Sequence, residues 1–186
     1  MTSEREDLER QIESVIAEGD RVLAGLSGAQ VNWRIAPDRW SVAECVSHLD
    51  VSIRAVLPAL DRAVETARAR GLVGSGTGRY GWFAHWMVRS QEPPVKRRMR
   101  TFPVFQPVAA HHDAARLLAE FRAVRGELRE RLARAEGIDW GRAKVVSPAS
   151  RFFRLPFGAY VAFLLAHDRR HLWQAREVRN HPGFPA

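Results

Sequence analysis

Apolar residues recur along most of this chain at the three- and four-residue spacing of amphipathic helices, and no segment alternates cleanly as a half-buried strand would. The pattern predicts long helices over residues 4–26, 41–70, 111–135 and 156–179. The apolar stripe of the first helix consists of Leu8, Ile12, Val15, Ile16, Leu23 and Leu26. That of the third consists of Leu117, Leu118, Phe121, Val124, Leu128 and Leu132. Four such helices joined by irregular segments favour an all-α fold, specifically a four-helix bundle.

The second predicted helix has the clearest boundaries. Ser41 is followed three residues later by Glu44, the pattern of a capping box, in which each side chain accepts a hydrogen bond from the backbone N–H of the other residue. Gly71 suits the left-handed conformation that commonly ends a helix. Pro58 lies inside this span and is expected to kink or interrupt the helix, because proline lacks a backbone donor and crowds the preceding turn.

The segments between these helices are rich in glycine and proline. Residues 71–81 are expected to form a plain loop rather than a phosphate-binding loop, because no strand precedes them and no Gly-Lys-Ser/Thr follows. Residues 82–90 predict a short helix. Residues 91–110, with four prolines and the basic run 96–100, predict an extended surface excursion. Residues 138–155 are expected to form another loop.

The composition suits one domain that covers residues 1–186 and buries its own core, since 46% of the residues are apolar and 27% are charged. No apolar run approaches the roughly 20 residues that a membrane span needs. The first ten residues are charged and contain no apolar signal-peptide core, so we expect a cytoplasmic protein. Cys45 is the single cysteine, which makes an intramolecular disulfide impossible.

The formal net charge of +8 permits attraction to nucleic acid, anionic lipid or acidic small molecules. The arginines are spread along the chain and interleaved with acidic residues, and no predicted helix carries a one-sided basic stripe with aromatic residues. We therefore expect an arginine-rich solvated surface, with neither nucleic acid nor a membrane as partner.

His167 and His171 lie four residues apart in the last predicted helix, so both imidazoles project from one face. They continue an apolar stripe made of Tyr160, Phe163, Leu164, Ala175 and Val178. This places them inside the bundle. There they either converge on one cation or, as ordinary core histidines, make hydrogen bonds to neighbouring helices.

His48 favours the metal site. Its helical neighbours Cys45, Val51 and Ala55 place it on the inward face of the second helix, so a third imidazole can complete a set of three nitrogen ligands. Three protein ligands leave coordination positions open, as in catalytic sites. Neutral imidazole binds Zn²⁺, Ni²⁺, Fe²⁺ and Cu²⁺, so the ligands alone do not determine the metal.

Two motifs carry a family resemblance: W-x-x-x-P-x-x-W-S-x-x-E-x-x-x-H-L over residues 33–49 and H-D-R-R-H-x-x-Q over residues 167–174. Together with the Pro-rich segment between them, they resemble the DinB/YfiT-like family of helix-bundle proteins. The resemblance implies a divalent metal, with Zn, Ni or Fe as the expected ions, on His48, His167 and His171. It also implies a metal-dependent transferase of low-molecular-weight thiols, a thiol-dependent isomerase, a hydrolase or a stress-induced protein, and a homodimer.

We therefore expect a metal-dependent enzyme with a small-molecule substrate, since a cation with open positions lowers the pKa of a bound thiol or water. A low-molecular-weight thiol cofactor would attack an electrophile as the thiolate, whereas bound hydroxide would attack an ester or amide. The alternative is a non-catalytic stress-response or binding protein whose metal is structural or absent.

The remaining candidates have simpler interpretations. Glu44, the nearest carboxylate, is expected to cap its helix, and Asp168 to be a surface group or to support a ligand from behind. Cys45 is expected to pack in the core, and Gln174 to contact the site without binding the metal. The basic run 96–100 is either a solvated loop or an anion-attracting rim of the pocket. The expected members of the core or the pocket wall are Trp33, Trp40, Trp82, Trp86 and Trp173. No second histidine lies at a matching helical spacing from His85, His111 or His112, so these three are not expected to bind the metal.

Overall fold

The computed structural model describes the chain apart from residues 1–2, 77, 95–100 and 108–110. The described residues form six α-helices, one turn of 3-10 helix and a two-stranded sheet, so the helical class is confirmed in its main feature. The helices are α1 (Glu4–Leu23), α2 (Gly28–Asn32), α3 (Val42–Ala69), α4 (Trp82–Arg89), α5 (Ala114–Arg134) and α6 (Phe157–Arg179). The 3-10 turn is η1 (Pro103–Phe105), and the strands are β1 (Lys144–Ser147) and β2 (Ser150–Pro156).

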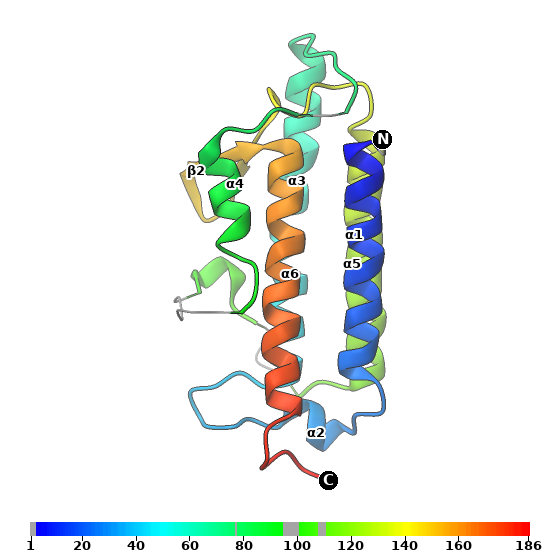
Figure 1. Cartoon of the computed structure of the whole chain (residues 1–186), viewed down its shortest axis with the longest axis vertical. Helices are drawn as coiled ribbons and strands as arrows, with labels where there is room; N and C mark the ends of the chain where they lie inside the picture. Colours follow the sequence, from blue (N-terminus) through cyan, green and yellow to red (C-terminus); the bar gives the residue numbers. More distant parts are fainter. Residues whose placement is uncertain (1–2, 77, 95–100, 108–110) are drawn as a thin grey trace.

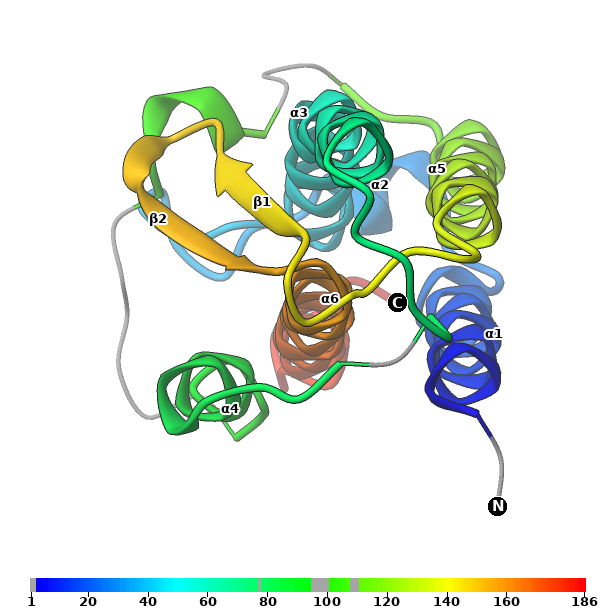
Figure 2. The same ribbon diagram turned by 90° about the horizontal axis from the view of Figure 1, so that it is seen from above.

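The four long helices α1, α3, α5 and α6 run side by side and enclose the core (Figures 1 and 2). Helix α3 packs against both α5 and α6, and α1 packs against the same two helices. Ile12, Leu49, Phe121 and Leu165 are fully buried, one from each long helix. Burial of one such side chain contributes about 1.5–3 kcal/mol to folding. Among the described residues, no helix is both long enough and apolar enough to cross a bilayer.

The capping box predicted for the second long helix is present. The Ser41 hydroxyl accepts a hydrogen bond from the Glu44 N–H at 3.1 Å, and the Glu44 carboxylate accepts one from the Ser41 N–H at 2.9 Å. Gly71 follows the end of α3 with a φ of +61°, as predicted. Helix α3 continues through Pro58 without interruption. Pro58 lies on the exposed face, while the flanking residues Leu57 and Ala59 are anchored in the core.

The third long helix, predicted over residues 111–135, begins at Ala114 because Asp113 is its N-cap. Two further expectations are also wrong. The first helix ends at Leu23 rather than residue 26, because Gly25 adopts a φ of +71° and the short helix α2 then begins with its own capping box at Ser27. Residues 138–155 are not a plain loop, since β1 and β2 pair antiparallel, with Val145 opposite Leu155. Val145 and Leu155 are the only buried apolar side chains of the two strands. One buried apolar residue in each strand gives no alternating pattern from which a strand could be predicted. The all-α expectation therefore omitted this hairpin.

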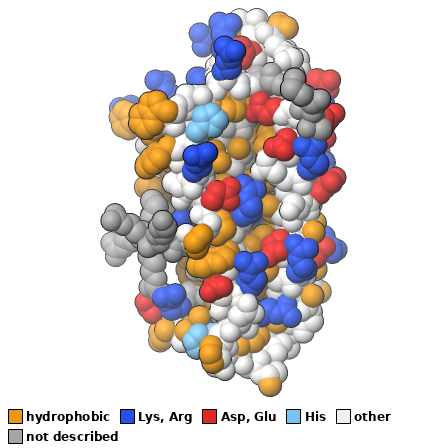
Figure 3. All heavy atoms as spheres, in the orientation of Figure 1, with side chains coloured by type: hydrophobic (Ala, Val, Ile, Leu, Met, Phe, Trp, Pro, Cys, Tyr) orange, Lys and Arg blue, Asp and Glu red, His pale blue; other side chains and the backbone are white. Residues whose placement is uncertain are grey.

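The aromatic residues of α4 are exposed, contrary to the expectation that its tryptophans lie in the core or a pocket wall. Trp82 is 80% exposed and Trp86 is 56% exposed. Figure 3 shows hydrophobic side chains gathered on the surface in the region of α4 and β2. Trp140, for which no position was predicted, is fully buried, and its indole N–H donates to the Ala135 carbonyl at 2.8 Å.

Candidate metal centre

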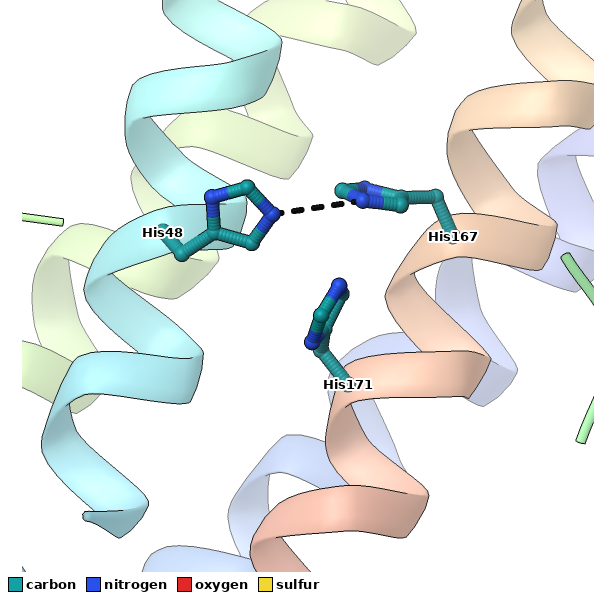
Figure 4. Close-up of side chains that lie close together, drawn as sticks. All are labelled: His48, His167 and His171. Atoms are coloured by element: carbon teal, nitrogen blue, oxygen red, sulfur yellow. Dashed lines mark hydrogen bonds between the residues drawn. The ribbon is translucent and has the colours of Figure 1, made fainter. Parts of the chain in front are cut away.

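The three predicted histidines meet at one point between two helices. His48 projects from α3, and His167 and His171 project from α6, one turn apart, with the three rings pointing toward one another (Figure 4). One ring nitrogen from each lies within 4.8 Å of the other two, and the Nε2 atoms of His48 and His167 are 3.3 Å apart. The predicted convergence is confirmed, while the binding of a metal stays a prediction.

Two outer hydrogen bonds orient the rings. His48 Nδ1 lies 2.5 Å from the Phe105 carbonyl oxygen in η1, and His171 Nδ1 lies 3.0 Å from Oε1 of Gln174. A carbonyl or amide oxygen only accepts hydrogen bonds, so we assign the ring proton of His48 and of His171 to Nδ1. The lone pair on Nε2 of each of these two rings is then free to bind a metal. The contact predicted for Gln174 is thus confirmed. The Phe105 carbonyl was missed, because a backbone group 57 residues from His48 leaves no signal in the sequence.

Burial keeps all three imidazoles neutral. It lowers the pKa of His48 to about 4 and, together with the neighbouring His48 and Arg170, lowers the pKa of His171 to about 3. The pKa of His167 is held well below its usual value by burial and then by the two other histidines. Neutral imidazole is the form that binds a metal, so the donors need not lose a proton first.

The residues present fit a divalent cation. Two nitrogens bound at about 2.0–2.1 Å to one tetrahedral cation are about 3.3 Å apart, which is the separation of the Nε2 atoms of His48 and His167. Two unprotonated nitrogens at this distance repel each other unless a cation or a proton lies between them. Among the described residues, no carboxylate or thiolate joins the cluster. Such a site therefore leaves the full charge of a bound ion uncompensated.

The histidines line a cavity of about 790 Å³, within the usual range for small-molecule sites. Trp40 and Trp173 lie in its wall, as expected for these two tryptophans. The Trp40 ring lies 4.8 Å from that of His48 and 5.6 Å from that of His171, measured between centroids. A ligand of substantial size can therefore reach the three imidazoles from one side, while aromatic rings cover them from another.

A buried charge cluster ties the two ligand-bearing helices together. Arg125 of α5 is fully buried and donates to both oxygens of Asp168, at 2.5 and 3.2 Å, and to Oδ1 of Asp50. Its guanidinium also lies 3.5 Å from the centroid of the Phe121 ring. Asp168 directly follows His167, and Asp50 lies two residues after His48. The Asp50–Arg125–Asp168 cluster therefore supports the site from behind.

This cluster corrects one interpretation and adds two residues. Asp168 is fully buried, so its placement as a surface group is wrong and the alternative, support from behind, is the one its position fits. Asp50 and Arg125 were missed. A signal existed for Arg125, since it lies four residues after Phe121 and three before Leu128 and so interrupts the apolar stripe of α5 with a charge.

The other candidate groups do not join the histidine cluster. Glu44 caps α3 and pairs with Arg34, whose Nε donates to it at 2.8 Å. Cys45 is fully buried in the core, as expected, and burial raises the pKa of its thiol. His85, His111 and His112 lie outside the cluster. The basic run 96–100 lies outside the described residues.

Comparison with known proteins identifies the family of the chain. A family model described as the DinB superfamily matches residues 11–175, a span that runs from α1 to α6 and includes all three histidines. No curated protein and no solved structure matches the chain.

Proposed function

Since the chain belongs to the DinB superfamily, we propose that it is a metal-dependent enzyme in which His48, His167 and His171 hold a divalent cation that activates a low-molecular-weight thiol or a water. The observation that carries the proposal is the convergence of three neutral imidazoles from two helices on the wall of a large cavity. Zn²⁺, Ni²⁺ and Fe²⁺ suit this donor set. We also infer that the four long helices form the four-helix bundle expected for this family.

The bound cation would supply a lowered pKa for a thiol or water that reaches it from the cavity. The chain itself supplies orientation and selectivity. Phe105 and Gln174 hold the proton of two imidazoles on Nδ1, which keeps each Nε2 directed at the centre. Three protein ligands leave positions open toward the cavity.

A thiol is favoured over water because, in the described part of the chain, no carboxylate joins the three histidines. Asp38 is the one carboxylate among the described residues that line the cavity, and it is exposed. A thiol whose pKa a bound cation had lowered would release its proton to water and would need no further base to attack an electrophile, whereas hydrolysis of an amide also requires proton transfer to the leaving group. Thiol transfer to an electrophile is therefore the first form of the proposal, and hydrolysis is the second.

The metal content of purified protein tests the site. Wild type is expected to hold close to one equivalent of a divalent metal by elemental analysis, and His167→Ala to lose most of it, because two imidazoles remain. His85→Ala is the matched control, since His85 is exposed on α4 and outside the cluster. Equal metal content in wild type and His167→Ala would refute the proposal.

Turnover separates an enzyme from a non-catalytic binding protein. Metal-loaded protein is incubated with glutathione, cysteine or coenzyme A and the electrophile 1-chloro-2,4-dinitrobenzene, and the conjugate is followed by its absorbance. A parallel series with p-nitrophenyl esters tests hydrolysis. Metal binding without turnover in either series would favour the alternative, a stress-response or binding protein with a structural metal.

A further inference from the structure

Aromatic side chains line much of the cavity beside the three histidines. Its aromatic lining consists of Trp40, Phe102, Phe105, Phe153, Tyr160, Phe163 and Trp173. The Phe153 ring of β2 lies 5.7 Å from that of Phe163 and 6.0 Å from that of Tyr160, between centroids. The Phe163 ring is in turn nearly parallel to that of His167, with 7° between their planes. A flat apolar group packs well against such a wall.

One cationic side chain of α6 lies close to the metal centre. Arg170 lines the cavity, follows His167 by three residues and directly precedes His171. It is half-buried, and its Nη1 donates to the Ser90 carbonyl at 3.4 Å. The charge of Arg170 contributes to the lowered pKa of both His167 and His171. The positive charge of its guanidinium is therefore close enough to these two histidines to raise the electrostatic potential at the site.

Few acidic side chains face the cavity among the residues that the structure describes. Besides Arg170 and the histidines, the charged side chains of this described lining are Asp38 and Arg39, both exposed. The buried carboxylates Asp50 and Asp168 bind Arg125 and do not line this cavity. A divalent cation on three neutral imidazoles would add two more positive charges. One anionic ligand would offset one of these charges, so a further anion would still be favoured.

We propose that this cavity binds an organic anion as substrate: a carboxylate held by Arg170, with an aromatic or similarly flat apolar body packed against Phe153 and Phe163. A guanidinium presents two parallel N–H groups that match a carboxylate. The cavity volume of about 790 Å³ accommodates such a molecule together with a small thiol. The inference rests on the proposed function in treating this cavity as the substrate site, but the binding step itself does not require the metal.

The test compares two probes that differ in one charge. Binding of 2-naphthoate and of its neutral analogue 2-naphthamide is measured by isothermal titration, with the full chain as purified and after dialysis against EDTA. The naphthoate is expected to bind about tenfold more tightly than the amide in both preparations, as a charge-assisted pair allows. Acetate, which leaves the aromatic wall uncovered, is expected to bind at least tenfold more weakly than the naphthoate.

Variants test which residues bind the carboxylate of the probe and which bind its naphthalene ring. Arg170→Met is expected to remove the preference for naphthoate over naphthamide, and Arg170→Lys to retain part of it. Phe153→Leu is expected to weaken both naphthalene probes equally. Arg176→Met is the matched control, since Arg176 lies on the same helix but pairs with Glu18 of α1 at 2.9 Å, outside the cavity.

Three results would overturn the proposal. The first is equal affinity for naphthoate and naphthamide in wild type. The second is a preference that survives Arg170→Met, which would place the carboxylate on another group, such as the metal. The third is a preference for 3-mercaptopropionate over 2-mercaptoethanol with none for naphthoate, which would assign Arg170 to the thiol cofactor. A protein without metal refutes the proposed function, whereas the EDTA-treated preparation still decides this inference.

Discussion

Removal of the buried guanidinium of Arg125 is expected to destabilise the protein strongly. The side chain of Arg125 is 0% exposed, and those of its partners Asp168 and Asp50 are 1% and 8% exposed. Arg125→Met keeps most of the volume but leaves two buried carboxylates without their counter-charge. Breaking a buried ion pair in this way costs about 3–5 kcal/mol. That loss is a large fraction of the roughly 5–15 kcal/mol that stabilises a typical domain.

Urea unfolding followed by far-ultraviolet circular dichroism measures the effect. With a typical slope of about 2 kcal/mol per molar urea, the midpoint is expected to fall by about 2 M. The triple variant Asp50→Asn, Arg125→Met, Asp168→Asn removes all three charges, so it is expected to recover most of the lost stability. Arg122→Met is the control, because Arg122 lies on the same helix but forms an exposed pair with Asp20, and its midpoint is expected to be unchanged.

Comparison of these variants distinguishes the effect of uncompensated charge from that of lost packing. A midpoint for Arg125→Met within 0.3 M of wild type, on the order of the error of such a measurement, would show that the cluster contributes little to folding. A triple variant as unstable as Arg125→Met would show that lost packing, rather than uncompensated charge, causes the loss. In either case the account of Arg125 as an electrostatic tie between α3 and α6 would be refuted.

Three further predictions concern the helix cap, the ligand support and the tryptophans. Burial alone would raise the pKa of Glu44, but hydrogen bonds from Arg34 and Ser41 outweigh it and the pKa is lowered. Its stabilisation is therefore present above its unfolded pKa of 4.5 and is lost as the pH falls through the folded value. Glu44→Gln keeps the capping hydrogen bond but removes the charge beside Arg34, so it should lower stability by about 0.5 kcal/mol at pH 7 and by progressively less toward pH 3 in urea titrations. Gln174→Ala should weaken metal binding about tenfold in chelator competition, because the Nδ1 partner of His171 is lost, and an unchanged affinity would contradict that role. Trp140→Ala should cost about 3–5 kcal/mol of unfolding free energy and Trp82→Ala less than about 0.5 kcal/mol, since the first side chain is fully buried and the second is 80% exposed; comparable losses would contradict the assignment.

Local sequence patterns determined where the long helices form and which side chains lie on the inward face of each helix. The spacing of His167 and His171 places them on one face of any helix that contains them, whatever packs around it. The Ser41 capping box sets where α3 begins, and the apolar period of α3 then turns His48 inward. These features depend on residues within one or two turns of each other, so a single sequence is enough to predict them. The inward position of His48 favoured a cation shared by the two helices, and the family resemblance implied the same three ligands.

The tertiary structure alone decided which distant residues meet. His48 and His167 are 119 residues apart in the chain, and their contact exists because α3 and α6 pack side by side. The Phe105 carbonyl behind His48, the Asp50–Arg125–Asp168 cluster and the pairing of β1 with β2 are likewise set by packing between elements. Such contacts depend on how whole helices and loops fill space around one core. The spacing of residues within a single helix or loop therefore does not predict how the elements pack together.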